Sequence, residues 1–190
     1  KGFDDLLRLF KKITLKYPDW KLNVIGDGLY KNELLDLAKE LKLGDKVIFH
    51  GYQDKEYIKE VMLNTSIYVM TSLSEAFGIS LLEAMSYGNC CVVSDIVENA
   101  SVVEDKGITF EKGNVKSLEK ELKNLLEDER IVHMLKKESR EFITKKYNWD
   151  EIVDKTIQLY ENEPMPRKSA KETKKKIRAA MAEGNEHERV

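Results

Sequence analysis

The chain has 190 residues, of which 42% are hydrophobic and 35% charged, and its formal net charge is −2. This length predicts one domain with an appendage, large enough to bury about two-thirds of the surface that the unfolded chain exposes. The near balance of charges gives no support to nucleic-acid binding, and the sequence lacks the run of about 18 apolar residues that a membrane-spanning helix requires.

Hydrophobic patterns typical of helices and of short buried strands alternate along the chain. Helical spacing of apolar residues predicts helices over 3–17, 29–41, 56–62, 79–86, 115–126, 131–145 and 149–160. Short apolar runs predict strands over 22–25, 47–49, 67–70, 90–94 and 108–110. This alternation favours an α/β fold, a doubly wound, Rossmann-like parallel sheet with helices on both faces. Ligands bind such folds beyond the carboxyl ends of the strands, where this chain has the loops 26–28, 51–53 and 71–78.

The composition changes after Tyr160. Residues 164–190 are rich in Lys, Arg and Glu and poor in large apolar side chains. We therefore expect a folded domain over 1–161 and a charged tail over 162–190 that is partly helical or disordered. The basic run at 174–176 is a candidate for peripheral contact with an anionic membrane.

The two cysteines, Cys90 and Cys91, are adjacent within a predicted strand. Their side chains point to opposite faces of that strand, so a bridge between them would be strained. Both are expected to be small buried hydrophobic residues, and the absence of a disulfide pattern favours a reducing, cytoplasmic location.

The segment 71–95, TSLSEAFGISLLEAMSYGNCCVVSD, begins directly after a predicted strand. Glu75 and Glu83 are separated by seven residues, and Gly78 precedes the helix that begins at Ile79. A helix N-terminus beside a glycine suits a diphosphate, because free N–H groups face the anion and no Cβ obstructs it. Carboxylates beside such a site accept hydrogen bonds from hydroxyl groups, such as those of sugar and ribose. The pattern therefore favours a sugar nucleotide as ligand.

This segment resembles the signature of glycosyltransferase family 4, whose members have the GT-B fold. The similarity rests on the Glu-x7-Glu spacing and on the sequences EAFGI and LLEAMSYG. It continues in LNVIGDG at 22–28, KVIFHGY at 46–52 and NWDEIVDKTIQLY at 148–160. The resemblance implies that the chain is the C-terminal, donor-binding half of such an enzyme. It also implies that a strand, a partner arginine and an N-terminal acceptor domain precede Lys1.

The resemblance implies roles for the two carboxylates and the loops around them. Glu83 would bind the ribose of the donor nucleotide, and Glu75 would bind the donor sugar. The backbone that holds the diphosphate and the sugar would be that of Phe77, Gly78, Ile79 and Ser80. The turn that frames the base would consist of Gly51, Tyr52 and Gln53.

The phosphate side of the cleft would be lined by Gly26 and Gly28, although glycines also simply end strands. Lys1 matches a lysine in the family's phosphate-binding segment, and its charge would stabilise the departing diphosphate. No cofactor and no metal ion are expected, because the sequence has neither an Asp-x-Asp motif nor a His/Cys cluster with metal-ligand spacing.

The implied reaction moves a hexosyl-type sugar from a nucleoside-diphosphate sugar to a hydroxyl acceptor with retention of anomeric configuration. This chain alone is expected to be inactive, because the acceptor half is not within it. Two features depart from the family pattern. Cys90 occupies a position where many relatives have proline, and 94–99 (SDIVEN) replaces the common Gly-Gly-x-Pro-Glu.

Three alternatives remain at this stage. A binding module would hold a nucleotide sugar without turning it over, and adding the acceptor half would separate it from an enzyme domain. A dinucleotide-dependent oxidoreductase would need G-x-G-x-x-G, but Lys31 stands at the third glycine position. An interaction module would act through the basic tail, so deletion of 164–190 would abolish partner binding and leave nucleotide binding intact.

Overall fold

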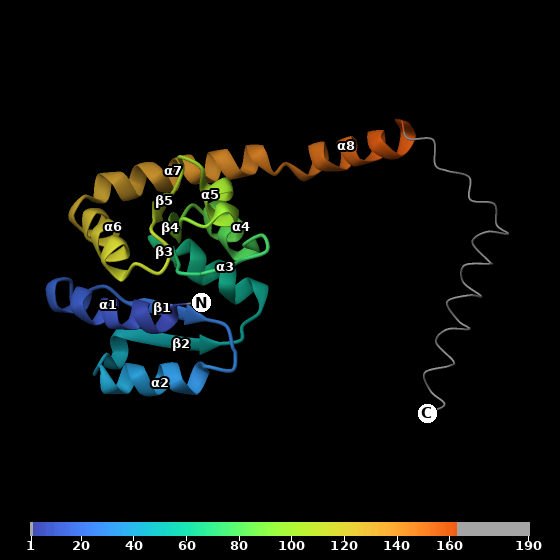
Figure 1. Ribbon diagram of the computed structural model, residues 1–190. Helices are drawn as coiled ribbons and strands as arrows, with labels where there is room; N and C mark the ends of the chain where they lie inside the picture. Colours follow the sequence, from blue (N-terminus) through green and yellow to red (C-terminus); the bar gives the residue numbers. More distant parts are fainter. Residues whose placement is uncertain (1, 163–190) are drawn as a thin grey trace, which may run out of the picture. The chain divides into compact units, whose positions relative to one another are not determined.

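The computed structural model describes residues 2–162 (Figure 1). Contacts divide the chain into two units, Lys1–Lys146 and Tyr147–Val190. The helices of the first unit are α1 (Phe3–Lys16), α2 (Lys31–Glu40), the short 3₁₀ helix η1 (Gly44–Lys46), α3 (Lys55–Leu63), α4 (Ile79–Ser86), α5 (Val97–Val103), α6 (Val115–Glu127) and α7 (Glu129–Lys146). Its strands are β1 (Leu22–Ile25), β2 (Val47–Gly51), β3 (Ile67–Met70), β4 (Cys90–Ser94) and β5 (Ile108–Phe110). The described part of the second unit is α8 (Trp149–Asn162).

The strands and helices that the hydrophobic pattern predicts are all present, with small differences at their ends. β1, β3, α4, β4 and β5 have the predicted bounds residue for residue. The sequence does not predict α5 or η1. Both are short, and a helix of about two turns shows too few apolar repeats to reveal a period of 3.6 residues.

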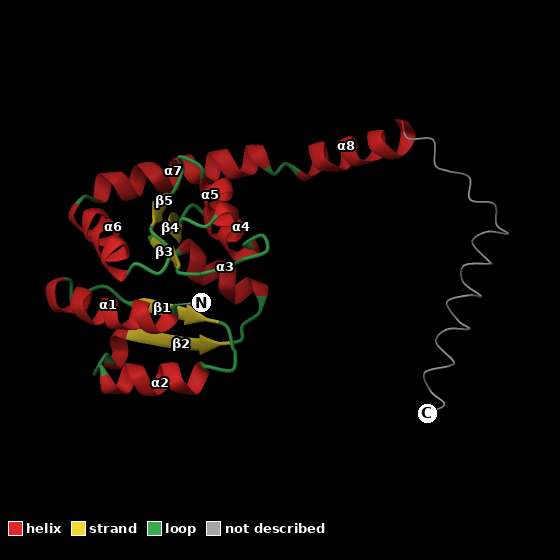
Figure 2. Ribbon diagram, in the orientation of Figure 1, coloured by secondary structure: helices red, strands yellow, loops and turns green. Residues whose placement is uncertain are grey.

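All paired strands are parallel, as expected for an α/β fold, and they form two sheets (Figure 2). β1 pairs with β2 in one sheet, and β4 lies between β3 and β5 in the other. Within residues 2–162, no hydrogen-bonded ladder joins β1 to β3. The described strands therefore fall into a two-stranded and a three-stranded parallel sheet.

β4 is the most deeply buried strand. All five of its residues are buried, and α4, α5 and α7 contact it. A strand covered by helices on both faces has no solvent side, which explains its continuous apolar sequence. Cys90 and Val92, on one face, belong to the main hydrophobic core, in which residues of α1, α6 and α7 also take part.

α1 shows how the sequence specifies a core-facing helix. Asp4 and Asp5 lie in its first turn and Lys16 in its last, as the helix dipole favours. Its buried face consists of Leu6, Leu7, Leu9, Phe10 and Ile13. Burial of a large apolar side chain contributes roughly 1.5–3 kcal/mol, so this face fixes α1 on the core.

α8 is described by itself. Its large apolar side chains are exposed to a substantial degree: Ile152, Val153, Ile157, Leu159 and Tyr160. No helix within residues 2–162 combines the length and apolar character needed to cross a membrane. The basic run at 174–176 lies outside the described residues, and the predicted division into 1–161 and 162–190 stays a prediction.

Candidate functional site

The loop that follows β3 leads into the N-terminus of α4. Gly78 precedes the helix with φ 65°, a left-handed conformation that favours glycine, and it is buried. No side chain of the described residues caps this end of α4. The first N–H groups of a helix have no partner within the helix, so those of Ile79 and Ser80 are available to a ligand.

The two predicted carboxylates lie near Tyr68, a residue of β3. The Tyr68 hydroxyl donates a hydrogen bond to Oγ of Ser80 over 3.0 Å. Burial raises the pKa of Tyr68 to about 12, and the negative charges of Glu75 and Glu83 add to this shift. Both carboxylates are half-buried. Ser80, in the first turn of α4, therefore contacts a tyrosine whose ionisation both carboxylates influence.

A buried group of polar side chains that the sequence did not predict lies beside the loop before α4. Ser72, Ser94 and Asn99 are 2%, 0% and 1% exposed. Oγ of Ser72 donates a hydrogen bond to Oε1 of Glu75 over 2.7 Å. Ser94 ends β4 and Ser72 follows β3, so small polar residues at the carboxyl ends of buried strands were the available signal.

The loops after β1 and β2 meet through their backbones. The N–H of Gly26 donates to the carbonyl oxygen of Gly51 over 2.8 Å. The Asp27 carboxylate accepts hydrogen bonds from the Lys31 ammonium and the Gly28 N–H, and these bonds lower its pKa. Of the predicted phosphate-side glycines, Gly26 therefore lies beside Gly51, the first residue of the predicted base turn, and Gly28 is bonded to Asp27 in the same loop.

The other two residues of the predicted base turn, Tyr52 and Gln53, differ in how they are held. Tyr52 is 83% exposed, whereas the side-chain amide of Gln53 donates to the carbonyl oxygen of His50 over 2.8 Å. The ring nitrogens of His50 lie 2.9 Å from Oδ1 of Asn23 and 2.7 Å from the hydroxyl of Tyr57. His50 is thus held from both sides at the end of β2, and an exposed aromatic ring follows it.

The remaining candidate, Lys1, lies outside the described residues. Its neighbour Gly2 is close to the loop after β3, since a Cβ on Gly2 would be 2.9 Å from the carbonyl oxygen of Thr71. The described chain therefore begins beside the same loop that carries Glu75 and Gly78.

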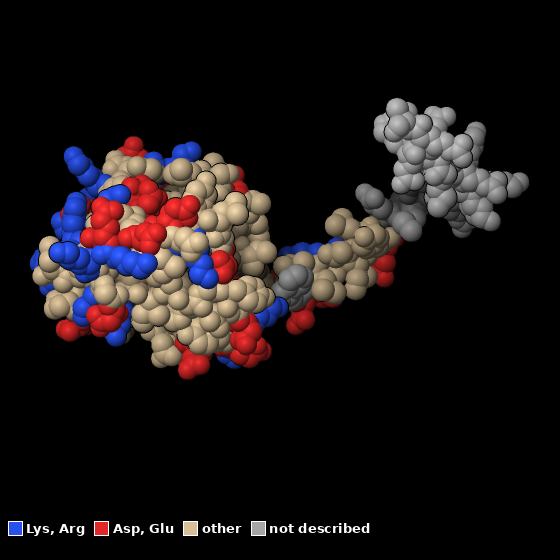
Figure 3. Space-filling view, turned by 90° about the horizontal axis from the view of Figure 1, so that it is seen from below, with Lys and Arg blue, Asp and Glu red and all other residues tan. Residues whose placement is uncertain are grey.

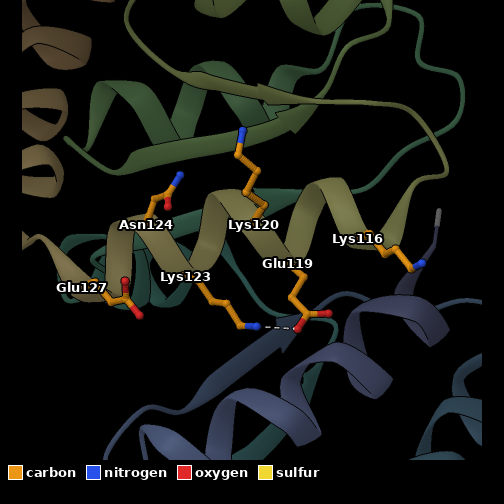
Figure 4. A pocket seen from close by; sticks show the side chains of 6 residues that line it. All are labelled: Lys116, Glu119, Lys120, Lys123, Asn124 and Glu127. Atoms are coloured by element: carbon orange, nitrogen blue, oxygen red, sulfur yellow. Dashed lines mark hydrogen bonds and ion pairs between the residues drawn. The ribbon is translucent and has the colours of Figure 1, made fainter.

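A separate hollow of about 530 Å³ lies along α6 (Figure 4). Its lining residues all come from that helix: Lys116, Glu119, Lys120, Lys123, Asn124 and Glu127. Glu119 pairs with Lys12 and Lys123, and Glu127 pairs with Lys16. On the face drawn in Figure 3, basic and acidic side chains likewise lie close together. Three lysines and two glutamates line the hollow, and both glutamates form ion pairs with lysines of α1 or α6.

The structure offers no ready metal site. Across the part of the chain that is described, no three His, Cys, Asp or Glu side chains come together as metal ligands would. The expectation that the reaction needs no metal stays a prediction. What the site presents is a set of helix N–H groups, hydroxyls and carboxylates, which are groups that bind phosphates and sugar hydroxyls.

Parallel strands with polar, glycine-containing loops at their carboxyl ends define the class of α/β proteins that bind ligands at that edge. Comparison with known proteins defines the particular family. A sequence profile for glycosyl transferases group 1 matches residues 1–142. The chain belongs to this family of transferases.

One relative is an uncharacterized glycosyltransferase of Methanocaldococcus jannaschii, with 32% identity over 166 residues, 84% of this chain and 41% of that protein. Anabaena HepE in complex with UDP and glucose has a TM-score of 0.75 and 19% identity, over 86% of this chain and 45% of that one. The C-terminal domain of a group 1 glycosyl transferase from Francisella tularensis has a TM-score of 0.69 and 22% identity, over 78% of this chain and 80% of that one.

These likenesses confirm the predicted fold class, since the structural neighbours are GT-B glycosyltransferases. The chain spans between 41% and 44% of the length of the first three curated relatives that it matches. It therefore corresponds to less than half of each of those proteins.

Proposed function

We propose that this chain is the donor-binding, C-terminal half of a retaining glycosyltransferase of family 4. The donor is a nucleoside-diphosphate sugar, and a hexosyl-type group moves to a hydroxyl acceptor. The observation that carries the proposal is the uncapped N-terminus of α4, where Gly78 precedes the helix, Ser80 is bonded to Tyr68, and Glu75 and Glu83 both act on that tyrosine. The UDP and glucose bound by Anabaena HepE support a ligand of this chemistry.

The N-terminus of α4 would hold the diphosphate. Its free N–H groups and the positive end of the helix dipole favour an anion. Because the Ser80 oxygen accepts a hydrogen bond from Tyr68, the Ser80 hydroxyl proton remains available for a phosphate or sugar oxygen. Glu83 would then accept from the ribose hydroxyls, and Glu75 from the sugar.

The backbone-linked loops after β1 and β2 would receive the rest of the nucleotide. Gly26 and Gly28 would line its phosphate side, and Gly51, Tyr52 and Gln53 would frame the base. Lys1 would add a positive charge for the departing diphosphate. These cations and dipoles replace a metal in the proposal, so the donor would bind in the presence of a chelator.

The acceptor site would belong to an N-terminal half that completes the cleft. The similarity to an isolated C-terminal domain from Francisella tularensis supports this division, because that domain corresponds to the chain along 80% of its length. The chain alone would bind the donor without transferring the sugar. We place the reaction at the cytoplasmic side of the cell, where the acceptor half or the basic tail provides any contact with a membrane.

Calorimetric titration of the chain with UDP, GDP and ADP, in the presence of EDTA, tests the proposal. We expect saturable binding of one of the three. Glu83→Ala should weaken that binding roughly 10- to 100-fold, because a hydrogen bond to a charged group is worth about 1.5–3 kcal/mol.

Glu121→Ala serves as the matched control, since Glu121 is also a half-buried helical glutamate but lies on α6. It should bind the nucleotide as the unchanged chain does. A folded chain that binds none of the three diphosphates would overturn the proposal, and so would equal binding by the Glu83 and Glu121 variants.

A further inference from the structure

Asn99, on α5, has a buried oxygen that points toward the start of α4. The residue is 1% exposed, and its Oδ1 has no hydrogen-bond partner among the described residues. A Cβ placed on Gly78 would lie 3.6 Å from this oxygen. A buried acceptor without a donor costs about 1–3 kcal/mol, so its position beside the candidate anion site requires an explanation.

The NH₂ group of the Asn99 side chain begins a series of hydrogen bonds that leads to Glu75. Nδ2 of Asn99 donates to Oγ of Ser94 over 3.1 Å, and Oγ of Ser94 donates to the carbonyl oxygen of Ser72 over 2.5 Å. Oγ of Ser72 then donates to Glu75 over 2.7 Å. Three hydrogen bonds therefore connect α5 to the carboxylate that is proposed to bind the donor sugar.

The hydrogen bonds also fix which way the Asn99 amide faces. The Ser94 hydroxyl uses its proton on Ser72, so its oxygen can only accept a further bond. The Ser94 carbonyl oxygen, 3.4 Å from the same Asn99 nitrogen, can only accept as well. The NH₂ group must face Ser94, and the oxygen must face Gly78.

We propose that Asn99 is a positioning residue of the donor site. Its NH₂ group holds Ser94 and Ser72, and through them Glu75, in the geometry that binds the sugar. Its oxygen accepts a hydrogen bond from the backbone N–H of Gly78 when a diphosphate occupies the N-terminus of α4. Occupation of the α4 N-terminus is thereby coupled to the orientation of Glu75. This assignment rests on the proposed function of the site.

Asn89 provides a matched control. It is 0% exposed, its Nδ2 donates to the carbonyl oxygens of Met62 and Thr65, and its Oδ1 also has no partner among the described residues. It lies at the amino end of β4, away from the carboxyl end where Ser94 stands. The two asparagines share their burial and their backbone bonds, and only Asn99 reaches the candidate site.

The test compares Asn99→Ala and Ser72→Ala with Asn89→Ala. Binding of UDP, GDP and ADP is titrated at a temperature where every variant is folded. Amide hydrogen exchange over 72–79 is measured with and without the bound nucleotide. We expect Asn99→Ala to weaken binding about fivefold or more, the loss of one hydrogen bond, and to lose the protection that the nucleotide confers on Gly78. Ser72→Ala should loosen the Glu75 loop and keep that protection at Gly78.

Asn89→Ala should lower the melting temperature and leave binding and loop protection within about twofold of the unchanged chain. Equal effects of the two asparagine variants on binding would overturn the assignment, because Asn99 would then act through stability alone. If the unchanged chain binds no nucleotide, the proposed function fails. The positioning role of Asn99 is then tested by amide hydrogen exchange in the protein without nucleotide. Faster exchange over 72–79 in Asn99→Ala than in Asn89→Ala would support a role in ordering the loop, and equal exchange would refute it.

Discussion

At Gly107, packing rather than backbone conformation requires the absence of a side chain. A Cβ at this position would lie 2.8 Å from Cβ of Val103 and 3.1 Å from the carbonyl oxygen of Cys91. Both neighbours are buried, one on α5 and one on β4, so neither can easily move away. The close approach of α5 to β4, which also places Asn99 beside Ser94, therefore depends on this glycine.

Gly107→Ala should destabilise the protein by about 1–3 kcal/mol, the usual cost of an extra group in a packed core. Gly28→Ala is the control, because nothing lies within 4 Å of a Cβ at that position. Urea unfolding of the two variants measures the difference. An alanine at 107 that costs no more than the alanine at 28 would show that α5 moves away without penalty.

The helices of the first unit differ in how their N-termini are satisfied. Asp54 caps α3, and Asn114 caps α6 by accepting from the N–H groups of Lys116 and Ser117. α4 has Gly78 at the same position and no side-chain cap. Capping satisfies the first N–H groups within the protein; α1, α2 and α5 also lack a side-chain cap, and only for α4 do we propose that a ligand takes its place.

Asn114→Ala should cost about 1 kcal/mol of stability, because the two N–H groups that it caps lose their acceptor. Asn124→Ala, an exposed position inside the same helix, should be neutral or stabilise slightly, since alanine has the higher helix propensity. Thermal unfolding of the pair checks the prediction. Equal melting temperatures would mean that the cap contributes nothing to the folded state.

The response of the whole molecule to pH follows from groups that the core desolvates. Burial raises the pKa of Cys90 from 9.0 to about 12, and it raises the pKa of Cys91 well above 9.0. Above pH 9 the unfolded chain loses these protons while the folded chain keeps them. Fewer protons bound in the unfolded state mean that stability falls as the pH rises. Tyr68, raised from 10.0 to about 12, adds to the fall above pH 10.

The free energy of unfolding should therefore decrease above pH 9, by about 1.4 kcal/mol per pH unit for each buried thiol once it titrates in the unfolded chain. Urea unfolding between about pH 7.5 and 10.5 measures this slope. Cys90→Ala should give a shallower slope, whatever its stability at neutral pH, because one of the two thiols is gone. If the free energy of unfolding falls with pH equally steeply in the unchanged chain and in Cys90→Ala, the buried Cys90 thiol is not a source of the pH dependence.

The sequence predicted the elements around the site better than the site's interior. β3, α4 and β4 have their predicted bounds because each is an apolar run with a clear period, bounded by turn residues. Glu75 and Glu83 were identified by their spacing around Gly78. Ser72, Ser94 and Asn99 were not: the two serines had only their places at the ends of β3 and β4 as a signal, and a buried asparagine on a short helix has the same local sequence appearance as an exposed one.

Local patterns by themselves determined the α/β fold class, the order of strands and helices, and the family signature at 71–95, because periodicity and spacing are properties of neighbouring residues. Only the tertiary structure decided the chain of hydrogen bonds from Asn99 to Glu75 and the raised pKa values of Cys90 and Tyr68. Each of these depends on segments far apart in the chain that meet on folding. Pairing, burial and desolvation depend on which distant segments contact one another in the folded chain, and the pattern of neighbouring residues does not reveal those contacts.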